Sequence, residues 1–543
     1  MSLLVQRRLE LAALWIVPVL MLIRGAPGSL GRATVDKSGH LWMGWHAARE
    51  APFSTRLLAF PEGLDLMPVL GGWLDVLLVG AFSRVLPLEP SYNLVLALYF
   101  FVAGLAGWAL SRALDAPRGA LVAGLLLQLD GFVWMHMDGG RPEQVGLGFA
   151  ALAAVALLEL RRLPGDSPWW KAALLGVMGG SVLWVSWELA LLTVLCTCVM
   201  LPVVLKQGHL RAAGIAAAAA LAVHGPWVLF FLLRTSAVRY TDESHFSQEV
   251  AERASVGLLS WLGPGPRPTW AALLCLVAVP FVSRDRRFWL AVLAGLFLLL
   301  VFALGPDPGF WSVNGLSGRP KAETFGVRGP FLWLQDLPVL GWFHWPNRLL
   351  AAWSVAAVGA AGVVVHRLPG RWAWGLGLGL VLSAAGEQSR QLPVTSKSVV
   401  IKAELVAVGQ MARGAVLDLP IQPEPAHHLH YQMMQLSHGR PILFNMVLDH
   451  LTRGSTYAMV QGDPVLSWFS SLMGPKAPAK PEWGRAELQT LQAQGFGVIA
   501  LHRRGWPTPK WQAGQDALRG VLGPAQVRGE ESYMAWELPR SQD

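Results

Sequence analysis

The chain has 543 residues, of which 53% are hydrophobic and only 15% are charged, and its mean hydropathy is +0.41. This balance excludes a soluble globular enzyme, because the charged residues are too few to cover the surface of such a chain. The formal net charge of +9 comes from arginines scattered through short loops. No basic run is interleaved with aromatic residues, so the sequence argues against a nucleic-acid partner.

Apolar runs that approach the roughly 20 residues needed to cross a bilayer recur through the N-terminal two thirds of the chain. They predict about eleven transmembrane helices, near residues 9–23, 92–111, 119–135, 144–160, 169–184, 189–205, 210–233, 269–283, 288–304, 348–365 and 372–386. Cytoplasmic loops tend to be short and basic, and this is the character of the loops 112–118, 161–171, 206–211, 283–287 and 366–371. The other connections are longer or acidic, and we expect them to face outside.

One further run, residues 66–86, is ambiguous. An N-terminus held inside by Arg7 and Arg8 reaches the basic 112–118 loop on the same side only if this run does not cross completely. Asp75 within the run also favours a segment that is not wholly in lipid. We therefore expect residues 66–86 to be re-entrant or interfacial. The alternative is twelve crossings with a cytoplasmic C-terminal domain.

The character of the sequence changes after residue 388. Residues 414–420 and 497–501 have the pattern of buried strands, and residues 485–494 have that of a helix. The sequence therefore predicts a transmembrane domain over residues 1–388 and a small soluble α/β domain over residues 389–543, outside the cytoplasm.

The first outer loop, residues 24–66, contains the first candidate site residue, Asp36. In the stretch 40–50 that follows, Trp42 and Trp45 share one helical face, which predicts a short helix lying in the membrane interface. Such a helix would place Asp36 just above the membrane.

A second group of polar residues follows the 119–135 span and comprises His136, Asp138, Arg141 and Glu143. The predicted topology places this group on the same side of the membrane as Asp36. A carboxylate there can take a proton from an attacking hydroxyl, and neighbouring Arg or His side chains can offset the charge that develops on a phosphate leaving group. Glu188, between two later spans, either faces the same outer cavity or is wetted at the interface.

Several motifs along the chain indicate one family: Asp36 with His40-Leu41-Trp42, Phe60-Pro61-Glu62-Gly63-Leu64-Asp65-Leu66-Met67, Pro142-Glu143, Phe343-His344-Trp345-Pro346-Asn347-Arg348 and His438-Gly439-Arg440-Pro441-Ile442. In these motifs the chain resembles the integral-membrane glycosyltransferases of the GT-C fold. That superfamily includes oligosaccharyltransferase catalytic subunits, protein O-mannosyltransferases and aminoarabinose transferases. The chain departs from the family pattern in lacking an Asp-x-Asp pair after the first span, and in having His344 where an Arg-x-Pro-x-Arg motif would begin.

The resemblance implies transfer of a hexosyl or pentosyl group from a polyprenyl-phosphate donor to an acceptor hydroxyl. The transfer would invert the anomeric carbon and take place on the outer face of the bacterial inner membrane, in the cell envelope. By the same resemblance Asp36 is the general base and Asp138 a second catalytic carboxylate. The implied substrate-binding residues are His40, His136, Arg141, Glu143, Glu188, His344 and Arg348.

The alternative to an enzyme is a non-catalytic GT-C-like protein that handles or transports lipid. It would keep the cavity and tolerate loss of the base. No cofactor follows from the sequence, and the need for a divalent metal stays open, as does the identity of the sugar and the acceptor. One cluster could ligate a metal, but its loose spacing and flanking prolines favour a loop; it consists of Glu424, His427, His428 and His430.

Overall fold

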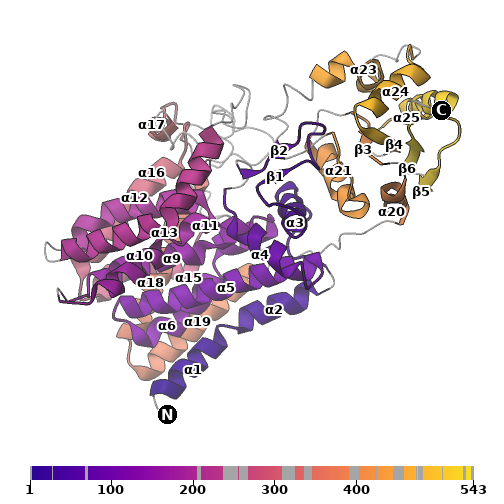
Figure 1. Ribbon diagram of the computed structural model, residues 1–543. Coiled ribbons are helices and arrows are strands. Elements are labelled where there is room, and N and C mark those ends of the chain that lie inside the picture. Colours follow the sequence, from indigo (N-terminus) through magenta and orange to yellow (C-terminus); the bar gives the residue numbers. More distant parts are fainter. Residues whose placement is uncertain are drawn as a thin grey trace.

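The computed structural model describes residues 3–26, 28–67, 71–164, 166–204, 209–236, 255, 267–308, 325–335, 345–389, 403–411, 413–421, 425–443, 458–472, 474, 481–503, 506–529 and 533–539. These residues form a long helical bundle with a small α/β unit at one end (Figure 1). The α/β unit lies at the end of the bundle opposite to the N-terminus.

The bundle is built from the helices of the N-terminal part of the chain, apart from the short helices of the loops. They are α1 (Leu3–Ala13), α2 (Ile16–Gly25), α5 (Leu88–Ala113), η2 (Pro117–Gly119), α6 (Ala120–Gln128), α7 (Gly131–Asp138), α8 (Pro142–Val145), α9 (Leu147–Leu160), α10 (Trp169–Gly180), α11 (Val182–Val185), α12 (Trp187–Val204), α13 (Leu210–Ser236), α15 (Trp270–Val282), α16 (Arg286–Ala303), η7 (Pro346–Leu350), α18 (Ala351–Arg367) and α19 (Gly370–Ser389). A short helix, α17 (Phe331–Gln335), lies outside this series.

Within the described residues, seven helical stretches are long and apolar enough to cross a membrane, and each coincides with a predicted span. They are Leu88–Ala113, Pro117–Asp138, Pro142–Leu160, Trp187–Val204, Leu210–Arg234, Arg286–Ala303 and Pro346–Arg367. Two shorter apolar helical stretches, Trp169–Val185 and Trp270–Val282, coincide with two more. The chain is therefore an integral membrane protein, whereas the full count of eleven crossings stays a prediction.

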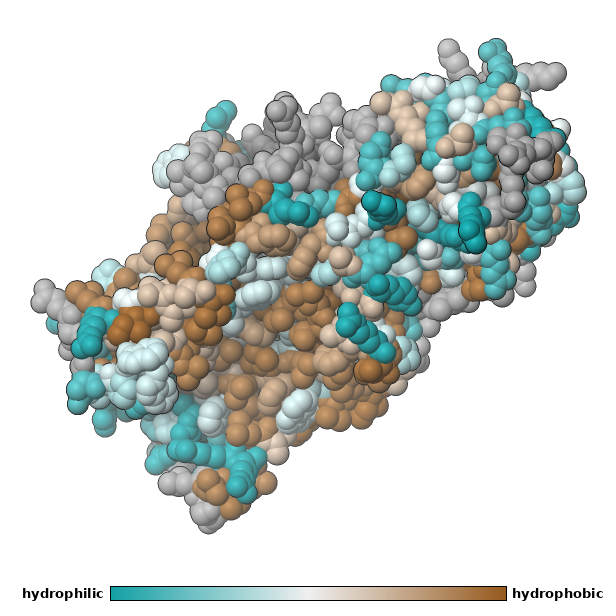
Figure 2. Space-filling view, in the orientation of Figure 1, coloured by the Kyte–Doolittle hydropathy of each residue, from teal (hydrophilic) through white to brown (hydrophobic). Residues whose placement is uncertain are grey.

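The surface of the bundle has the polarity that a bilayer requires. Figure 2 shows hydrophobic residues over the middle of the bundle and hydrophilic residues toward its ends and over the α/β unit. Large apolar side chains stand exposed on several helices, among them Leu229, Phe281 and Phe297. Exposed side chains of this kind are stable only against lipid or a partner.

The ambiguous run 66–86 contains one helix, α4 (Leu74–Phe82), while residues 68–70 lie outside the described part of the chain. Nine helical residues rise roughly 14 Å, about half of the roughly 30 Å hydrocarbon thickness of a bilayer. Helix α4 packs between the outer-loop helix α3 (Val35–Ala47) and α5. Its length matches the expectation of a segment that does not cross completely.

Helix α3 begins earlier than the predicted helix over 40–50. It starts at Val35 because Thr34 caps it: the Thr34 Oγ1 accepts a hydrogen bond of 3.2 Å from the backbone N of Lys37. Trp42 and Trp45 are buried, and the Nε1 of Trp42 donates to the Oε1 of Gln435 at 2.7 Å. The helix is thus covered by protein, whereas the sequence suggested one lying open in the interface.

The C-terminal unit holds a four-stranded sheet of order β3-β4-β6-β5, in which β3 and β4 are parallel and the other pairs are antiparallel. The predicted strands 414–420 and 497–501 correspond to β3 and β4, and the predicted helix 485–494 to α24. The elements are β3 (Ala415–Leu419), β4 (Phe496–His502), β5 (Val527–Gly529), β6 (Tyr533–Glu537), α20 (Ala403–Gln410), α21 (Pro425–His438), α23 (Pro464–Ser471), α24 (Arg485–Ala493) and α25 (Thr508–Leu522).

The first outer loop joins this unit to the bundle. The loop contains a two-stranded antiparallel ribbon of β1 (Ser54–Thr55) and β2 (Leu64–Asp65). The Nε2 of Gln435 on α21 donates to the backbone O of Leu57 at 2.6 Å, and the ring of Phe60 packs edge-on against Phe496, with centroids 5.1 Å apart. These contacts hold the α/β unit above α3, at the end of the bundle where Asp36 lies.

Candidate functional site

Asp36 stands in the first turn of α3 and bonds to the turn that precedes α8. Its Oδ2 accepts a hydrogen bond of 2.6 Å from the Nε of Arg141. The same turn is fastened a second time, because the Thr34 Oγ1 donates to the backbone O of Gly139 at 2.7 Å. The Asp36 side chain keeps 40% of its surface exposed. It is therefore both fixed in position and accessible from outside the protein.

Two arginines far apart in the sequence meet at one aromatic ring. The Cζ atoms of Arg141 and Arg348 lie 5.2 and 5.1 Å from the ring centroid of Trp345. Cation–π attraction stabilises each guanidinium at this ring, but two like charges so placed also repel each other. An anion between or beside them would relieve that repulsion, so the pair is suited to bind a phosphate.

Arg348 is buried and forms an ion pair with Glu188 at the start of α12. The Glu188 Oε2 also accepts a hydrogen bond of 2.8 Å from the Nε2 of Gln144. Glu188 is 4% exposed, so it is a buried partner of Arg348 and not a carboxylate wetted at the interface. The Nε of Arg348 has no hydrogen-bond partner among the residues that the structure describes.

His136, on α7, adds a further nitrogen donor. The residue is 1% exposed, and its ring lies 4.4 Å from that of Phe132. Neither ring nitrogen has a hydrogen-bond partner in the described part of the chain. A buried imidazole without partners is costly, and a bound ligand or ordered water would supply what it lacks. Electrostatically it is close to both Arg141 and Arg348.

The span Pro117–Asp138 is interrupted between α6 and α7, and this break sets the direction of α7. Helix α6 ends at Gln128, and Asp130 caps the new helix, its Oδ1 accepting a hydrogen bond of 2.9 Å from the backbone N of Phe132. The Oγ of Ser354, on α18, donates to the same oxygen at 2.8 Å. The break fixes the direction in which α7 presents His136 and Asp138.

Asp138, the second predicted carboxylate, is held by a different arginine. The Nε of Arg32 lies 2.6 Å from its Oδ2, and the backbone N of Arg32 donates to its backbone O at 2.9 Å. The turn over residues 138–141 is therefore held at both ends, by Arg32 at Asp138 and by Asp36 at Arg141. The structure thus brings the loop that contains Asp36 and the turn after α7 together, while the role of these residues as a site stays a prediction.

His40 contacts two carboxylates, those of Asp75 and Glu143. The His40 Nδ1 lies 2.6 Å from the Asp75 Oδ2, and its Nε2 lies 3.1 Å from the Glu143 Oε2. Burial disfavours the charged imidazole, but the charges and hydrogen bonds of the two carboxylates more than offset it, so the pKa of His40 lies well above its usual value. The two carboxylates thus favour the charged form of the imidazole.

The donor set at this site does not match a divalent cation. Each of Asp36, Asp138, Glu143 and Glu188 is paired with an arginine or a histidine. In the described ranges, no three His, Cys, Asp or Glu side chains are grouped so as to hold a metal ion. Of the predicted residues, His344 and Glu424 lie outside the described residues, as do the side chains of the three histidines of the 427–430 cluster.

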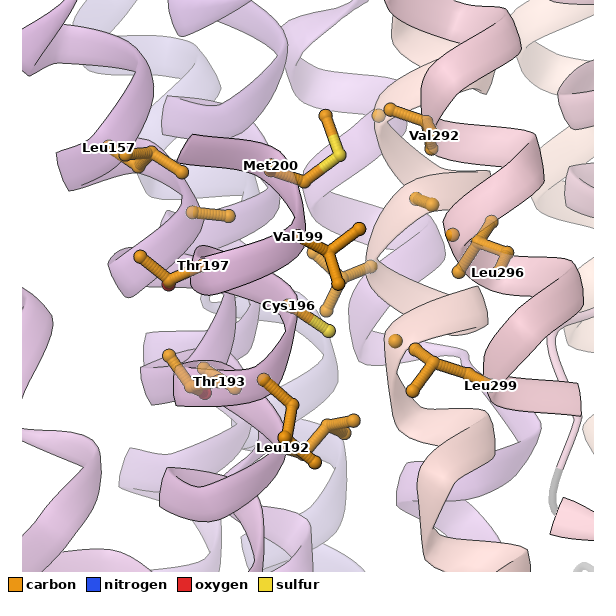
Figure 3. Close-up of a pocket in the computed structure, with 18 of the residues that line it drawn as sticks. Leu157, Leu192, Thr193, Cys196, Thr197, Val199, Met200, Val292, Leu296 and Leu299 are labelled. Atoms are coloured by element: carbon orange, nitrogen blue, oxygen red, sulfur yellow. The ribbon is translucent and has the colours of Figure 1, made fainter. Parts of the chain in front are cut away.

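An apolar pocket descends from this polar cluster through the bundle. It encloses about 1100 Å³ of empty space, open surroundings included. Figure 3 shows the side chains of α12 facing those of α16 across it. The lining begins one helical turn below the polar residues, since Leu147, Leu192 and Ala351 follow Glu143, Glu188 and Arg348 by four, four and three positions.

Sequence reasoning missed three contributors: Trp345, Gln144 and the pairing of Asp75. Trp345 belongs to a motif that the sequence singled out, but nothing in that motif indicates that Arg141 would reach its ring. Asp75 stood out only as an ionisable residue in an apolar run. An intramembrane ionisable residue normally has a partner, which is the one signal that could have led to His40.

Solved structures share this fold over nearly the whole chain. The arabinofuranosyltransferase AftD from mycobacteria aligns with 99% of the chain at a TM-score of 0.57 and 14% identity, and a second AftD structure aligns with 98% at 0.61 and 13%. The chain spans only 40% and 42% of those AftD chains. ArnT from Cupriavidus metallidurans, in the apo state, aligns over 99% of both chains at 0.50 and 12% identity.

Comparison with protein-family models and with curated proteins finds no match. The fold is thus recognisable through structure and not through sequence similarity. The chain has the fold of the GT-C membrane glycosyltransferases.

Proposed function

We propose that this protein is a membrane glycosyltransferase that moves a sugar from a polyprenyl-phosphate donor to an acceptor hydroxyl, with Asp36 as general base. One observation carries the proposal: an anion site directly above an apolar groove. Arg141 and Arg348 flank Trp345, and the pocket beneath them is lined by aliphatic side chains. A polyprenyl phosphate has an anionic head and a long apolar tail, so one ligand matches both parts.

The arrangement suits an inverting displacement. The acceptor oxygen attacks the anomeric carbon while its proton passes to the Asp36 carboxylate, and the bond from that carbon to the phosphate oxygen breaks. The phosphate leaves with the bonding electron pair, and the two guanidinium groups stabilise its charge. Asp138 lies at the other end of the same turn, where it can orient the acceptor. AftD, which shares the fold, is an arabinofuranosyltransferase, and this supports sugar transfer as the class of reaction.

The proposed topology places this site on the outer face of the bacterial inner membrane. It combines eleven crossings with an interfacial segment at 66–86, which brings the α/β unit outside. That unit covers α3 through Trp42 and Gln435, so it can close over the site or bind the acceptor.

The test is to follow donor lipids directly. The protein in nanodiscs is incubated with a total lipid extract of its host, and mass spectrometry follows polyprenyl-phosphate-linked sugars and free polyprenyl phosphate. We expect the sugar-linked form to fall as the free phosphate rises. Binding of the lipids without any such conversion would contradict catalysis and favour the lipid-handling alternative.

Filling the groove should weaken binding of the donor tail. Gly295 lines the pocket on α16, and the nearest heavy atom to a side chain there is 3.4 Å away, at Val199. We expect Gly295→Phe to weaken binding of decaprenyl phosphate about tenfold, an effect of about 1.4 kcal/mol, as measured by native mass spectrometry. The variant should leave the affinity for a short-chain prenyl phosphate almost unchanged.

The matched control is Val194→Phe, which adds a ring to the face of α12 turned away from this pocket. Val194 is 54% exposed, so the larger side chain has room. The affinity of this variant for decaprenyl phosphate should stay within about twofold of the wild type, because the added ring does not enter the pocket. A twofold change is well below the tenfold change that corresponds to about 1.4 kcal/mol. Equal losses in both variants would show that the tail does not lie in the groove.

A further inference from the structure

Helix α3 contacts the segment 141–143, at the start of α8, through two ion pairs. In one the negative charge is on α3, and in the other the positive charge is on α3. Asp36, which is negative, meets Arg141, and His40, one turn later on the same face, meets Glu143. The Asp36 contact reaches the proposed site, whereas the His40 contact lies beneath it and is buried, with the His40 side chain 6% exposed. Asp75 backs His40 from the far side at 2.6 Å.

Glu143 is a second carboxylate near Arg348, whose Nη1 is already paired with Glu188. It acts electrostatically on Arg348, the buried guanidinium that we expect to contact the donor phosphate. Without a cation of its own, Glu143 would draw Arg348 toward itself and compete with the phosphate. His40 supplies that cation, and Asp75 keeps the cation charged, so the partnerless Nε of Arg348 stays available.

We propose that His40 is a positioning residue for donor binding: its positive charge, held between Asp75 and Glu143, offsets the charge of Glu143 and thereby leaves the Nε of Arg348, which Glu188 does not hold, available to the donor phosphate. This inference rests on the proposed function, but it concerns a residue that touches neither substrate. The groups around His40 are those already named, together with Asp36 on its own helix and the hydroxyls of Tyr92 and Tyr99 on α5, which lie within electrostatic range of Asp75 and Glu143.

The test measures binding of decaprenyl phosphate to the purified full-length protein. His40→Gln keeps a polar side chain of similar size without the charge, and we expect it to weaken binding about ten- to a hundredfold at pH 7. The double variant His40→Gln/Glu143→Gln removes the competing carboxylate as well, and its binding should recover most of the loss. A purely structural role for His40 predicts no recovery, because the double variant has lost both partners of the contact.

The pH profile gives a second readout. Since the folded-state pKa of His40 is raised, its charge is fully present at low pH and is lost as the pH rises through that value. The ratio of wild-type to His40→Gln affinity should therefore be largest at low and neutral pH and fall toward one at alkaline pH. Taking the ratio removes the titration of the phosphate itself, whose second pKa is about 6.

The outcomes separate the two proposals. If the wild type fails to bind decaprenyl phosphate, the proposed donor and this inference both fall. If the wild type binds and His40→Gln binds equally well, or the double variant shows no recovery, only the role of His40 falls. If His40→Gln does not fold, His40→Lys is used in its place, because it keeps a cation at this position. The proposal then requires that His40→Lys binds decaprenyl phosphate within about tenfold of the wild-type affinity.

Discussion

Replacing Asp36 by Asn is expected to lower the rate of sugar transfer by about 10²–10⁴-fold, the usual contribution of a positioned general base. The amide has the size of the carboxylate, and its oxygen can still accept the hydrogen bond from Arg141. The substitution therefore keeps α3 attached to the turn before α8 and removes only the capacity to take a proton. Decaprenyl phosphate should bind to the variant with nearly wild-type affinity.

The measurement is the appearance of free polyprenyl phosphate from the host lipid extract, compared between variants at equal protein. Asp138→Asn is the matched control, because Asp138 is held in the same way by a different arginine, Arg32, at 2.6 Å. We expect the control to lose less activity than Asp36→Asn. A wild-type rate in Asp36→Asn would exclude Asp36 as the base.

Removing Arg348 should affect both stability and donor binding. Glu188 is 4% exposed and has Arg348 as its cationic partner, so Arg348→Ala leaves a buried carboxylate without its charge partner. Breaking a buried ion pair in this way costs about 3–5 kcal/mol. We expect a clear fall in the thermal unfolding temperature in detergent, together with loss of decaprenyl phosphate binding.

A double variant distinguishes these two effects. Arg348→Met/Glu188→Gln fills the volume without charge, and replacing a buried ion pair by neutral side chains of similar size is often close to neutral for stability. The unfolding temperature should recover, whereas binding of decaprenyl phosphate should not. Binding that recovers along with stability would mean that Arg348 supports the fold and does not contact the phosphate.

The start of α3 shows that the sequence encodes the helix boundary but not what covers the helix. Thr34 followed by Asp36 in the first turn is a helix start signal, and the structure uses it. The three-residue spacing of Trp42 and Trp45 instead predicted a helix over residues 40–50. Their indoles suggested contact with the membrane interface, and only the packing of Gln435 against Trp42 revealed that the C-terminal unit covers them.

The pairs at the site could not be read from the sequence, because they join positions far apart in the chain. The Asp36 to Arg141 hydrogen bond spans 105 positions, and the Ser354 to Asp130 hydrogen bond spans 224. Local patterning places each residue on a helix face or at a helix end. Which face meets which depends on the packing of the whole bundle, and that packing sets the partners of Asp36 and Asp130.

By itself, the sequence of this protein determined that the chain lies in a membrane and that it crosses the membrane as helices. Long apolar runs with few charges have no stable place in water, and a membrane allows them only as helices whose backbone groups are satisfied internally. The tertiary structure alone decided that Arg141 and Arg348 share Trp345 and that His40 joins Asp75 to Glu143. Burial makes an unpaired charge expensive, so these side chains take the partners that the folded bundle brings within reach.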